Sequence, residues 1–333
     1  MSEHARLGPS DAARWMVCPG SIEATKDMAD TESEYAKEGT EAHDYLEGYL
    51  KGEPVEVREY QLLDDAGKDA VHEAIDYILS RYSDGCQLYT ERKVNPGLVY
   101  GRQDLWGTLD VSLENFAEST LEIADYKHGQ GVPVDVEDNW QLIIYAVGAL
   151  HARDSWMPLP EKVILTIMQP RCHHPQGRIR SVEYTPQALA ELMEQVIAAA
   201  EKTDDPDAPL VASDKGCKWC KFAKCPARAE AALAAAQGVF QPEPVDRFSQ
   251  EQVLRDPGEL TDEEMFLVLD NRDLIRGFLK KVEEHAEATI KEGGRVRGFK
   301  MIPGRGQRSF AYPEEEVEKK LRNLHKSDGA KLG

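Results

Sequence analysis

The chain has 333 residues, 41% of them hydrophobic, which is enough for one large folded domain or two smaller ones. No apolar run is long enough to cross a membrane, and no hydrophobic segment of the signal-peptide type opens the sequence, so we expect a cytoplasmic protein without membrane contacts. The formal net charge of −20 disfavours contacts with phosphates, so a nucleic-acid-binding role requires lysine and arginine to be concentrated locally.

Two amphipathic helices are predicted near the start of the chain, after a short helix that ends near Cys18. Ser21 is the expected N-cap of the segment that follows. Residues 34–50 carry an apolar stripe at helical spacing, with His43 beside it, and residues 64–82 carry another. The two stripes consist of Ala42, Tyr45, Leu46 and Tyr49, and of Val71, Ile75, Ile78 and Leu79.

Strands are predicted at 87–94, 106–113, 121–126, 163–168 and 178–184. The second of them carries Asp110, and the third carries Asp125 with Lys127 two residues later. Because residues i and i+2 of a strand share a face, Asp125 and Lys127 point the same way, while Tyr126 points into the other layer. Two carboxylates and an ammonium at one spot suit Mg²⁺ or Mn²⁺, which can activate water against a phosphodiester. Glu122, on the same strand, is expected to be a solvated strand-edge carboxylate.

A helix is predicted at 140–152, with Asp138 or Asn139 as its N-cap. Gln141 and Tyr145 are four residues apart and therefore share one helical face, which can lean over the carboxylates. Tyr145 fits an ordinary core position equally well. Another long helix is predicted at 187–202, and the mixed order of strands and helices predicts an α/β layered fold.

Four of these segments together resemble the PD-(D/E)XK nuclease superfamily, and within it the RecB-like branch. They are the G-T-E-A-H segment that ends at His43, the strand that ends in Asp110, the D-Y-K segment from Asp125 to Lys127, and the Q-x-x-x-Y segment from Gln141 to Tyr145. They occur in the family's order and at plausible intervals, over roughly residues 14–230.

The resemblance implies a restriction-endonuclease-like core, in which a mixed central sheet is flanked by helices. It implies that His43, Asp110, Asp125 and the carbonyl of Tyr126 hold Mg²⁺ or Mn²⁺. Lys127 would act on the attacking water, and Gln141 and Tyr145 would position Lys127 and the strand end.

Three cysteines with C-x₂-C-x₄-C spacing, Cys217, Cys220 and Cys225, form an incomplete set of metal ligands, because four thiolates are usual for an iron–sulfur cluster or a structural zinc. Cys18 can supply the fourth. One cysteine before the nuclease segments and three after them resemble the RecB-like nucleases of the AddB and CRISPR adaptation types. That resemblance implies a [4Fe–4S] cluster, with zinc as the alternative occupant, joining the two ends of the nuclease domain. Cys86 and Cys172 lack such spacing and are expected to be ordinary core or surface residues.

Basic and aromatic residues crowd the same stretch. They could contact phosphates and stack on a base, or simply form a solvated face around the cluster. The candidates for DNA contact are Lys218, Trp219, Lys221 and Lys224, with Lys215 and Arg228 beside them.

The last third of the chain carries no recognisable motif. A linker is predicted at 241–244, helices at 261–270 and 271–292, and a basic tail after them. We therefore expect a nuclease domain at 1–240, closed by the cluster, and a helical extension at 241–333.

These observations predict a Mg²⁺- or Mn²⁺-dependent DNA exonuclease for recombination, repair or phage replication, acting in the cytoplasm of a bacterium or a phage-infected cell. Because the chain lacks helicase motifs, it most resembles a phage-encoded nuclease of this branch. It has no phosphate-binding loop of the GxxxxGK[ST] type, so duplex unwinding would need a helicase partner. A single-strand-binding or annealing protein is another candidate partner, and an oligomer is compatible with the sequence. The alternatives are a non-catalytic DNA-binding or assembly subunit with the same fold, and a structure-specific endonuclease.

Overall fold

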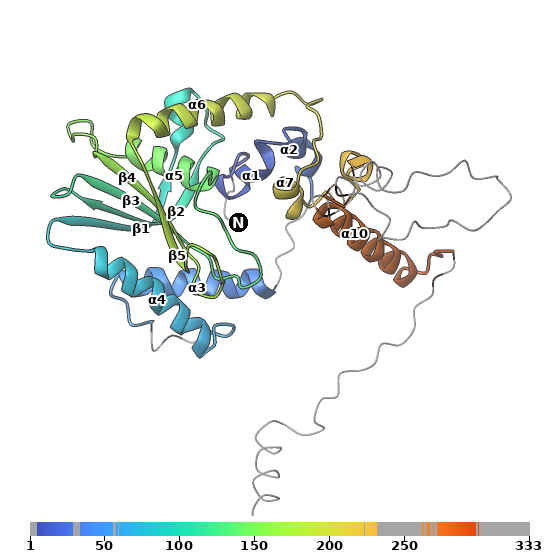
Figure 1. Cartoon of the computed structure of the whole chain (residues 1–333), viewed down its shortest axis with the longest axis horizontal. Helices are drawn as coiled ribbons and strands as arrows, with labels where there is room; N and C mark the ends of the chain where they lie inside the picture. The colour runs from blue at the N-terminus through green and yellow to red at the C-terminus, as the bar shows by residue number, and fades with distance from the viewer. Residues whose placement is uncertain are drawn as a thin grey trace, which may run out of the picture. The chain divides into compact units, whose positions relative to one another are not determined.

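A five-stranded mixed sheet forms the centre of the molecule (Figure 1). The computed structural model describes residues 5–28, 34–55, 58, 60–222, 224–231, 262, 265, 266, 269, 272–297 and 299. The strands lie in the order β1-β2-β3-β4-β5, and every neighbouring pair is antiparallel except β3 and β4, which are parallel. Their bounds are β1 Cys86–Val94, β2 Gly107–Asn115, β3 Thr120–Tyr126, β4 Lys162–Met168 and β5 Ile179–Tyr184.

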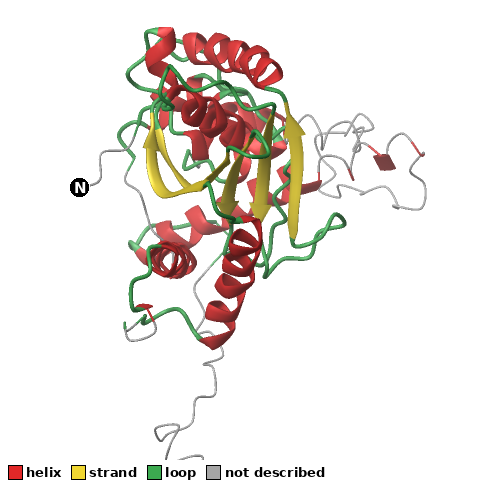
Figure 2. Cartoon of the chain, turned by 90° about the vertical axis from the view of Figure 1, so that its left-hand side faces the viewer, coloured by secondary structure: helices red, strands yellow, loops and turns green. Residues whose placement is uncertain are grey.

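Helices cover both faces of the sheet (Figure 2). One face carries α5 (Trp140–His151) and α6 (Pro186–Lys202), and the other carries α3 (Glu34–Leu50) and α4 (Asp65–Arg81). The parallel connection between β3 and β4 runs through α5, as a crossover between parallel strands requires. Each face buries its own apolar cluster, so the fold is a layered α/β structure, as the sequence predicts.

Side-chain caps set the starts of the helices around the sheet. Asp64 begins α4, Asn139 begins α5 and Thr185 begins α6, each accepting a hydrogen bond from the backbone amide three residues later. Of the two predicted caps for α5, Asn139 therefore fills the role. Asp138 precedes it with a positive φ of 51°, in the left-handed region that aspartate tolerates better than most residues.

Short helices occupy the ends of the central unit. They are η1 Pro9–Asp11, α1 Ala12–Trp15, α2 Gly20–Thr25, η3 Pro96–Tyr100 and α7 Asp214–Lys218. The prediction that Ser21 caps a helix is wrong, because Ser21 lies inside α2 with a buried side chain. Its carbonyl and hydroxyl oxygens instead accept hydrogen bonds from the Arg14 guanidinium at 3.3 and 3.1 Å.

The prediction of a solvated Glu122 is also wrong. This carboxylate is buried between β3 and α4, where it accepts hydrogen bonds from the Tyr77 hydroxyl at 2.7 Å and from Thr166 at 2.6 Å. The Arg81 guanidinium lies 3.1 Å from its other oxygen. A strand carboxylate is solvated only where no layer covers it, and α4 covers this one.

The C-terminal region is described chiefly through α10 (Arg272–Lys291), which matches the helix predicted at 271–292. Contacts between Cα atoms divide the chain into two units, Met1–Phe278 and Leu279–Gly333. The linker, the predicted boundary at 240, most of the helix at 261–270 and most of the basic tail lie outside the described residues. None of the described helices combines the length and apolar composition needed to cross a membrane.

Candidate functional site

Three side chains that could hold a metal ion meet where β1 and β2 pass beneath α3. They are His43 from α3, Glu91 from β1 and Asp110 from β2. Nδ1 of His43 lies 3.5 Å from Oδ2 of Asp110 and 3.9 Å from Oε1 of Glu91. One ligand atom from each residue lies within 4.8 Å of the other two. No other group of His, Cys, Asp or Glu side chains among the described residues meets this condition. An imidazole and two carboxylates form a ligand set for a divalent cation.

Glu91 did not figure in the sequence prediction. It stands opposite Asp110, because Thr90 pairs with Val111 and Arg92 pairs with Leu109 on either side. Its φ of 45° is uncommon for a residue other than glycine, and such backbone strain often accompanies a functional position. Burial, and after it the nearby Asp110 carboxylate, raises the pKa of Glu91 to about 7. No spacing in the sequence marks this residue, because its place in the site comes from strand register alone.

A chain of hydrogen bonds joins the other predicted site residues. Oδ2 of Asp110 accepts a bond from the backbone amide of Tyr126 at 2.7 Å, which fixes the end of β3 against β2. Nζ of Lys127 lies 2.9 Å from Oδ2 of Asp125 and donates to Oε1 of Gln141 at 3.1 Å. Nε2 of Gln141 in turn donates to Oδ1 of Asp125 at 3.0 Å. The structure thus brings Asp110, Asp125, Lys127 and Gln141 together.

Burial determines the electrostatics of the Asp125–Lys127 pair. Asp125 is only 2% exposed, and burial raises the pKa of its carboxyl group. Burial alone would lower the pKa of Lys127, but the carboxylates of Asp125 and Asp110 outweigh it and the net shift is upward. Lys127 therefore stays protonated, and its charge offsets that of the carboxylates around it.

Asp125 does not belong to the three-residue group of possible metal ligands. The predicted ligand set contained His43, Asp110, Asp125 and the Tyr126 carbonyl, whereas the structure groups His43 and Asp110 with Glu91. The Asp125 carboxylate is engaged by Lys127 and Gln141 instead. Its Oδ2 is buried and lies against the Lys127 ammonium at 2.9 Å, so a cation at this oxygen would have to share it with Lys127.

Tyr126 and Tyr145 enclose the group from two sides. The Tyr126 side chain is fully buried in the layer beneath α3, as predicted, and its hydroxyl lies 2.8 Å from Nδ1 of His128. Tyr145 is buried on the opposite face, where burial and the Asp125 carboxylate raise the pKa of its hydroxyl while a hydrogen bond with Gln141 lowers it in part. Gly107 lets this ring approach, because a Cβ there would lie 2.9 Å from Cε1 of Tyr145.

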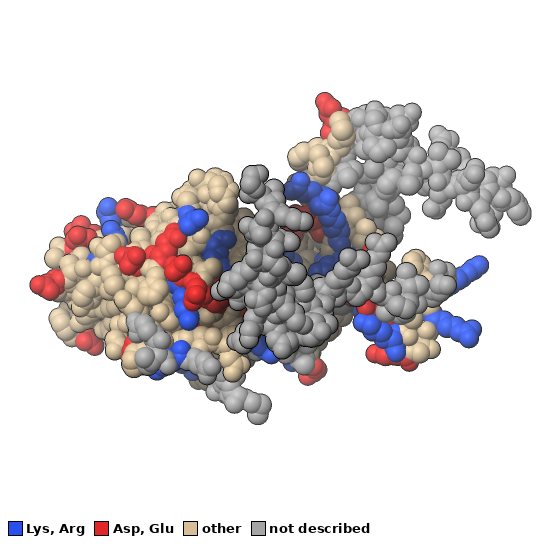
Figure 3. Space-filling view, turned by 90° about the horizontal axis from the view of Figure 1, so that it is seen from below, with Lys and Arg blue, Asp and Glu red and all other residues tan. Residues whose placement is uncertain are grey.

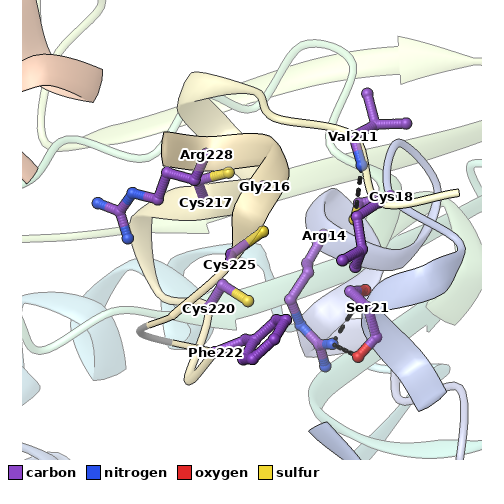
Figure 4. Close-up of a pocket in the computed structure, with 11 residues that line it drawn as sticks. Arg14, Cys18, Ser21, Val211, Gly216, Cys217, Cys220, Phe222, Cys225 and Arg228 are labelled. Carbon is purple, nitrogen blue, oxygen red and sulfur yellow. Dashed lines mark hydrogen bonds between the residues drawn. The ribbon is translucent and has the colours of Figure 1, made fainter. Parts of the chain in front are cut away.

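The four cysteines predicted to bind a cluster line one small pocket (Figure 4). Cys18 follows α1, and Cys217, Cys220 and Cys225 lie on α7 and the turn after it. Two backbone amides already donate to the sulfurs, from Val211 to Cys18 at 3.2 Å and from Ser213 to Cys217 at 3.3 Å.

The spacing of these thiols limits what they could hold. Four thiolates on one zinc ion would place their sulfurs no more than about 4.6 Å apart, twice the Zn–S bond length. Within the described part of the chain, no three cysteine sulfurs lie that close together. The cavity measures about 10 Å³, which is about the volume of one water probe. The pocket thus gathers four thiols without forming a tight single-ion site. Cys86 and Cys172 lie elsewhere and are buried.

The predicted DNA-contacting residues lie beside this pocket and face solvent. Lys218, Lys221 and Lys224 are exposed, and Trp219 is 75% exposed. Arg228 departs from the expected basic patch, because it is buried and lines the cysteine pocket. Acidic side chains are spread over much of the face in Figure 3, in keeping with the net charge of −20.

Comparison with known proteins identifies the family. A solved structure titled "Crystal structure of SSO0001" is 20% identical in sequence, and the match covers 68% of this chain and 89% of that chain with a TM-score of 0.32. A family model described as "Protein of unknown function (DUF2800)" matches residues 4–330. Because that match spans nearly the whole sequence, the chain belongs to the DUF2800 family.

Proposed function

We propose that this protein is a metal-dependent DNA exonuclease with a PD-(D/E)XK core. The observation that carries the proposal is the hydrogen-bonded set of Asp125, Lys127 and Gln141, with Asp110 bonded to the amide of Tyr126 and lying beside His43. The sequence resemblance assigns these same positions to phosphodiester hydrolysis, and they come from four separate elements of the fold. A purely structural cluster would not require a lysine and two acids to converge at one end of a sheet.

The ligand set fits Mg²⁺ or Mn²⁺. His43, Glu91 and Asp110 already lie within reach of one ion, and Asp125 is the further carboxylate that the resemblance assigns to the set. The Tyr126 carbonyl completes the set that the resemblance implies. A bound divalent ion would polarise the phosphodiester and lower the pKa of the attacking water.

The residues of the chain have separable tasks. Lys127, held protonated by its carboxylate neighbours, would stabilise negative charge on the phosphate and orient the water. Gln141 links the Lys127 ammonium and the Asp125 carboxylate through one hydrogen bond to each. Tyr145 excludes water from the α5 side and supports Gln141.

The test is cleavage of DNA by purified protein with Mn²⁺ or Mg²⁺. Asp110→Ala and Lys127→Ala should each lower the rate by about 10²- to 10⁴-fold. Glu183→Ala and Lys162→Ala, an exposed ion pair at the far end of the sheet, are matched controls that should leave the rate unchanged. End-labelled linear and covalently closed circular substrates separate exonuclease from endonuclease.

Two outcomes of that assay contradict the proposal. Cleavage that survives both site substitutions would remove the proposed site. A wild-type protein that binds DNA but does not cleave it with either metal would favour the non-catalytic assembly subunit.

We further propose that Cys18, Cys217, Cys220 and Cys225 ligate a [4Fe–4S] cluster. Support comes from the convergence of all four thiols on one pocket. Anaerobically purified protein should absorb broadly at about 400 nm, and Cys18→Ser should abolish the band while Cys172→Ser keeps it. A colourless protein that carries zinc would refute the assignment.

A further inference from the structure

An open cavity of about 420 Å³ lies beside the candidate metal site, within the range of small-ligand pockets, roughly 300–1,000 Å³. None of its lining residues is acidic, although the chain as a whole carries a net charge of −20. The lining consists of Ala5, Arg6, Lys93, Asn95, Leu98, Gln103 and Trp106. The lining thus combines amide and aromatic groups with Lys93 and with Arg6, whose charge is offset by Asp104 and Asp204.

Strand geometry places this cavity next to the metal ligands. Lys93 pairs with Thr108 and lies two residues along β1 from Glu91, which stands opposite Asp110. Two residues of a strand span about 7 Å. The side chains of Arg92 and Val94, the two neighbours of Lys93 in the strand, point toward α5. Arg92 donates to the carbonyl of Ala152 just beyond that helix at 3.0 Å, and Val94 packs against Gly148 within it. Alternation along residues 92–94 therefore points Lys93 away from α5, toward the side of the sheet that carries α3 and His43.

Two side chains of the cavity are poised for a ligand. Nζ of Lys93 lies 3.7 Å from the centre of the Trp106 ring and forms no ion pair within the described residues. This lysine therefore covers an aromatic face that another flat group could occupy, and its charge is available for an anion. Oδ1 of Asn95 is buried and accepts no hydrogen bond in the described part of the chain, an unfavourable state that a ligand donor would relieve.

We propose that this cavity binds the nucleotide that adjoins the scissile phosphate on a single DNA strand, an inference that rests on the proposed nuclease function. The base stacks on Trp106, and the Lys93 ammonium moves from the indole to the neighbouring phosphate. A base within a duplex is stacked on both sides and cannot offer its face to an indole. The site therefore selects an unpaired nucleotide, which makes single-stranded DNA or a frayed end the substrate class.

Binding without cleavage tests this site directly. A fluorescein-labelled single strand of about 12 nucleotides is titrated with the full-length protein in EDTA, with a duplex of equal length in parallel. Trp106→Ala should weaken binding of the single strand by about five- to 100-fold and change duplex binding little, while Trp106→Phe retains most of the affinity. Trp156→Ala, at a 76% exposed position near the opposite end of the sheet, is the matched control.

Salt dependence tests the lysine separately. Lys93→Gln should reduce the slope of log K against log salt by about 0.7 for the single strand, the contribution expected for one phosphate contact. Lys162→Gln should leave the slope unchanged. Because Lys93 is exposed, its variant tests the proposal even if Trp106→Ala fails to fold.

The outcomes distinguish this inference from the nuclease proposal. If the wild type cleaves DNA but the Trp106 and Lys93 variants bind the single strand as the wild type does, the subsite is wrong and the nuclease stands. If the wild type does not cleave but those variants lose affinity, the subsite stands as a single-strand-binding site and the nuclease is wrong.

Discussion

Glu91 shows how one residue can carry strain and charge at once. Its backbone adopts a positive φ, and its carboxylate lies beside His43 and the carboxylate of Asp110. Neither feature stabilises the metal-free fold, because an uncommon backbone conformation and the burial of like charges both cost free energy. A bound cation would remove the electrostatic part of that cost. The arrangement is therefore what a metal ligand requires and what a structural glutamate would avoid.

The metal-free protein should consequently lose stability as its Glu91 ionises. Its pKa is raised from 4.5 to about 7 on folding, so the folded state binds the proton more tightly than the unfolded state. The stabilising effect of protonation is complete below pH about 4.5 and is lost as pH rises through about 7. In EDTA, thermal unfolding scans should show that the melting temperature of the wild type falls relative to that of Glu91→Gln as pH rises from about 4.5 through about 7.

Addition of Mn²⁺ provides the control for this prediction. The metal should raise the melting temperature of the wild type at pH about 8 and raise that of Glu91→Gln less, because stabilisation by a ligand follows its affinity. Parallel pH profiles of wild type and variant in EDTA would show that Glu91 is not the group responsible.

At the scale of elements, the site depends on where helix α5 begins. The cap that Asn139 makes to the amide of Leu142 fixes the first turn, and that turn carries Gln141. Gln141 is the group that joins Lys127 to Asp125, so the register of one helix start determines the geometry of the charged pair. The cap of α6 by Thr185 has the same local geometry with no site residue after it.

These two caps form a matched pair for experiment. Asn139→Ala and Thr185→Ala should each lower the free energy of unfolding by about 1 kcal/mol, because each leaves one helix amide without its side-chain acceptor. Only Asn139→Ala should also lower the rate of DNA cleavage, at a temperature where both variants are fully folded. Urea denaturation and the nuclease assay measure the two effects, and equal losses of activity would contradict the positioning role of α5.

At the scale of the whole molecule, an ion-pair network ties the start of the chain to distant parts. Arg102 contacts Asp104 at 2.9 Å and Asp204 at 2.7 Å, and Arg6 reaches the same two carboxylates. The network joins the N-terminal segment, the connection before β2 and the turn after α6. Its core is Arg102, whose side chain is only 13% exposed.

Arg102→Gln should therefore cost more stability than an ordinary surface substitution, about 1–2 kcal/mol, since its bonds to carboxylates are charge-assisted and Arg102 is largely buried, while solvent weakens the bonds to the half-exposed Asp204. Arg178→Gln, which breaks an exposed pair with Glu73, should cost less than about 1 kcal/mol. Urea denaturation compares the two.

Arg102 also lowers the pKa of Asp204. The stability that the Arg102–Asp204 pair contributes is therefore fully present above the usual aspartate pKa of 3.8. It should be lost as pH falls below that value in the wild type but not in Arg102→Gln.

The sequence by itself determined the elements and most of the candidate site. Helical and strand patterns located α3, α4, α5 and all five strands to within a few residues, because α3 and α4 each bury one apolar face while α5 and β4 are nearly continuous apolar runs. Spacing also placed Asp125 and Lys127 on one face and Tyr126 on the other, because alternation along a strand is a local property.

Only the tertiary structure decided which residues from different elements meet. The register of β1 against β2 brings Glu91 to Asp110, the packing of α4 buries Glu122, and the fold gathers Cys18 with three cysteines about 200 residues away. The same packing makes Lys93 and Trp106 neighbours beside the metal ligands. Such contacts depend on pairing between segments that are distant in the chain, and local patterns of hydrophobicity and charge carry no record of that pairing.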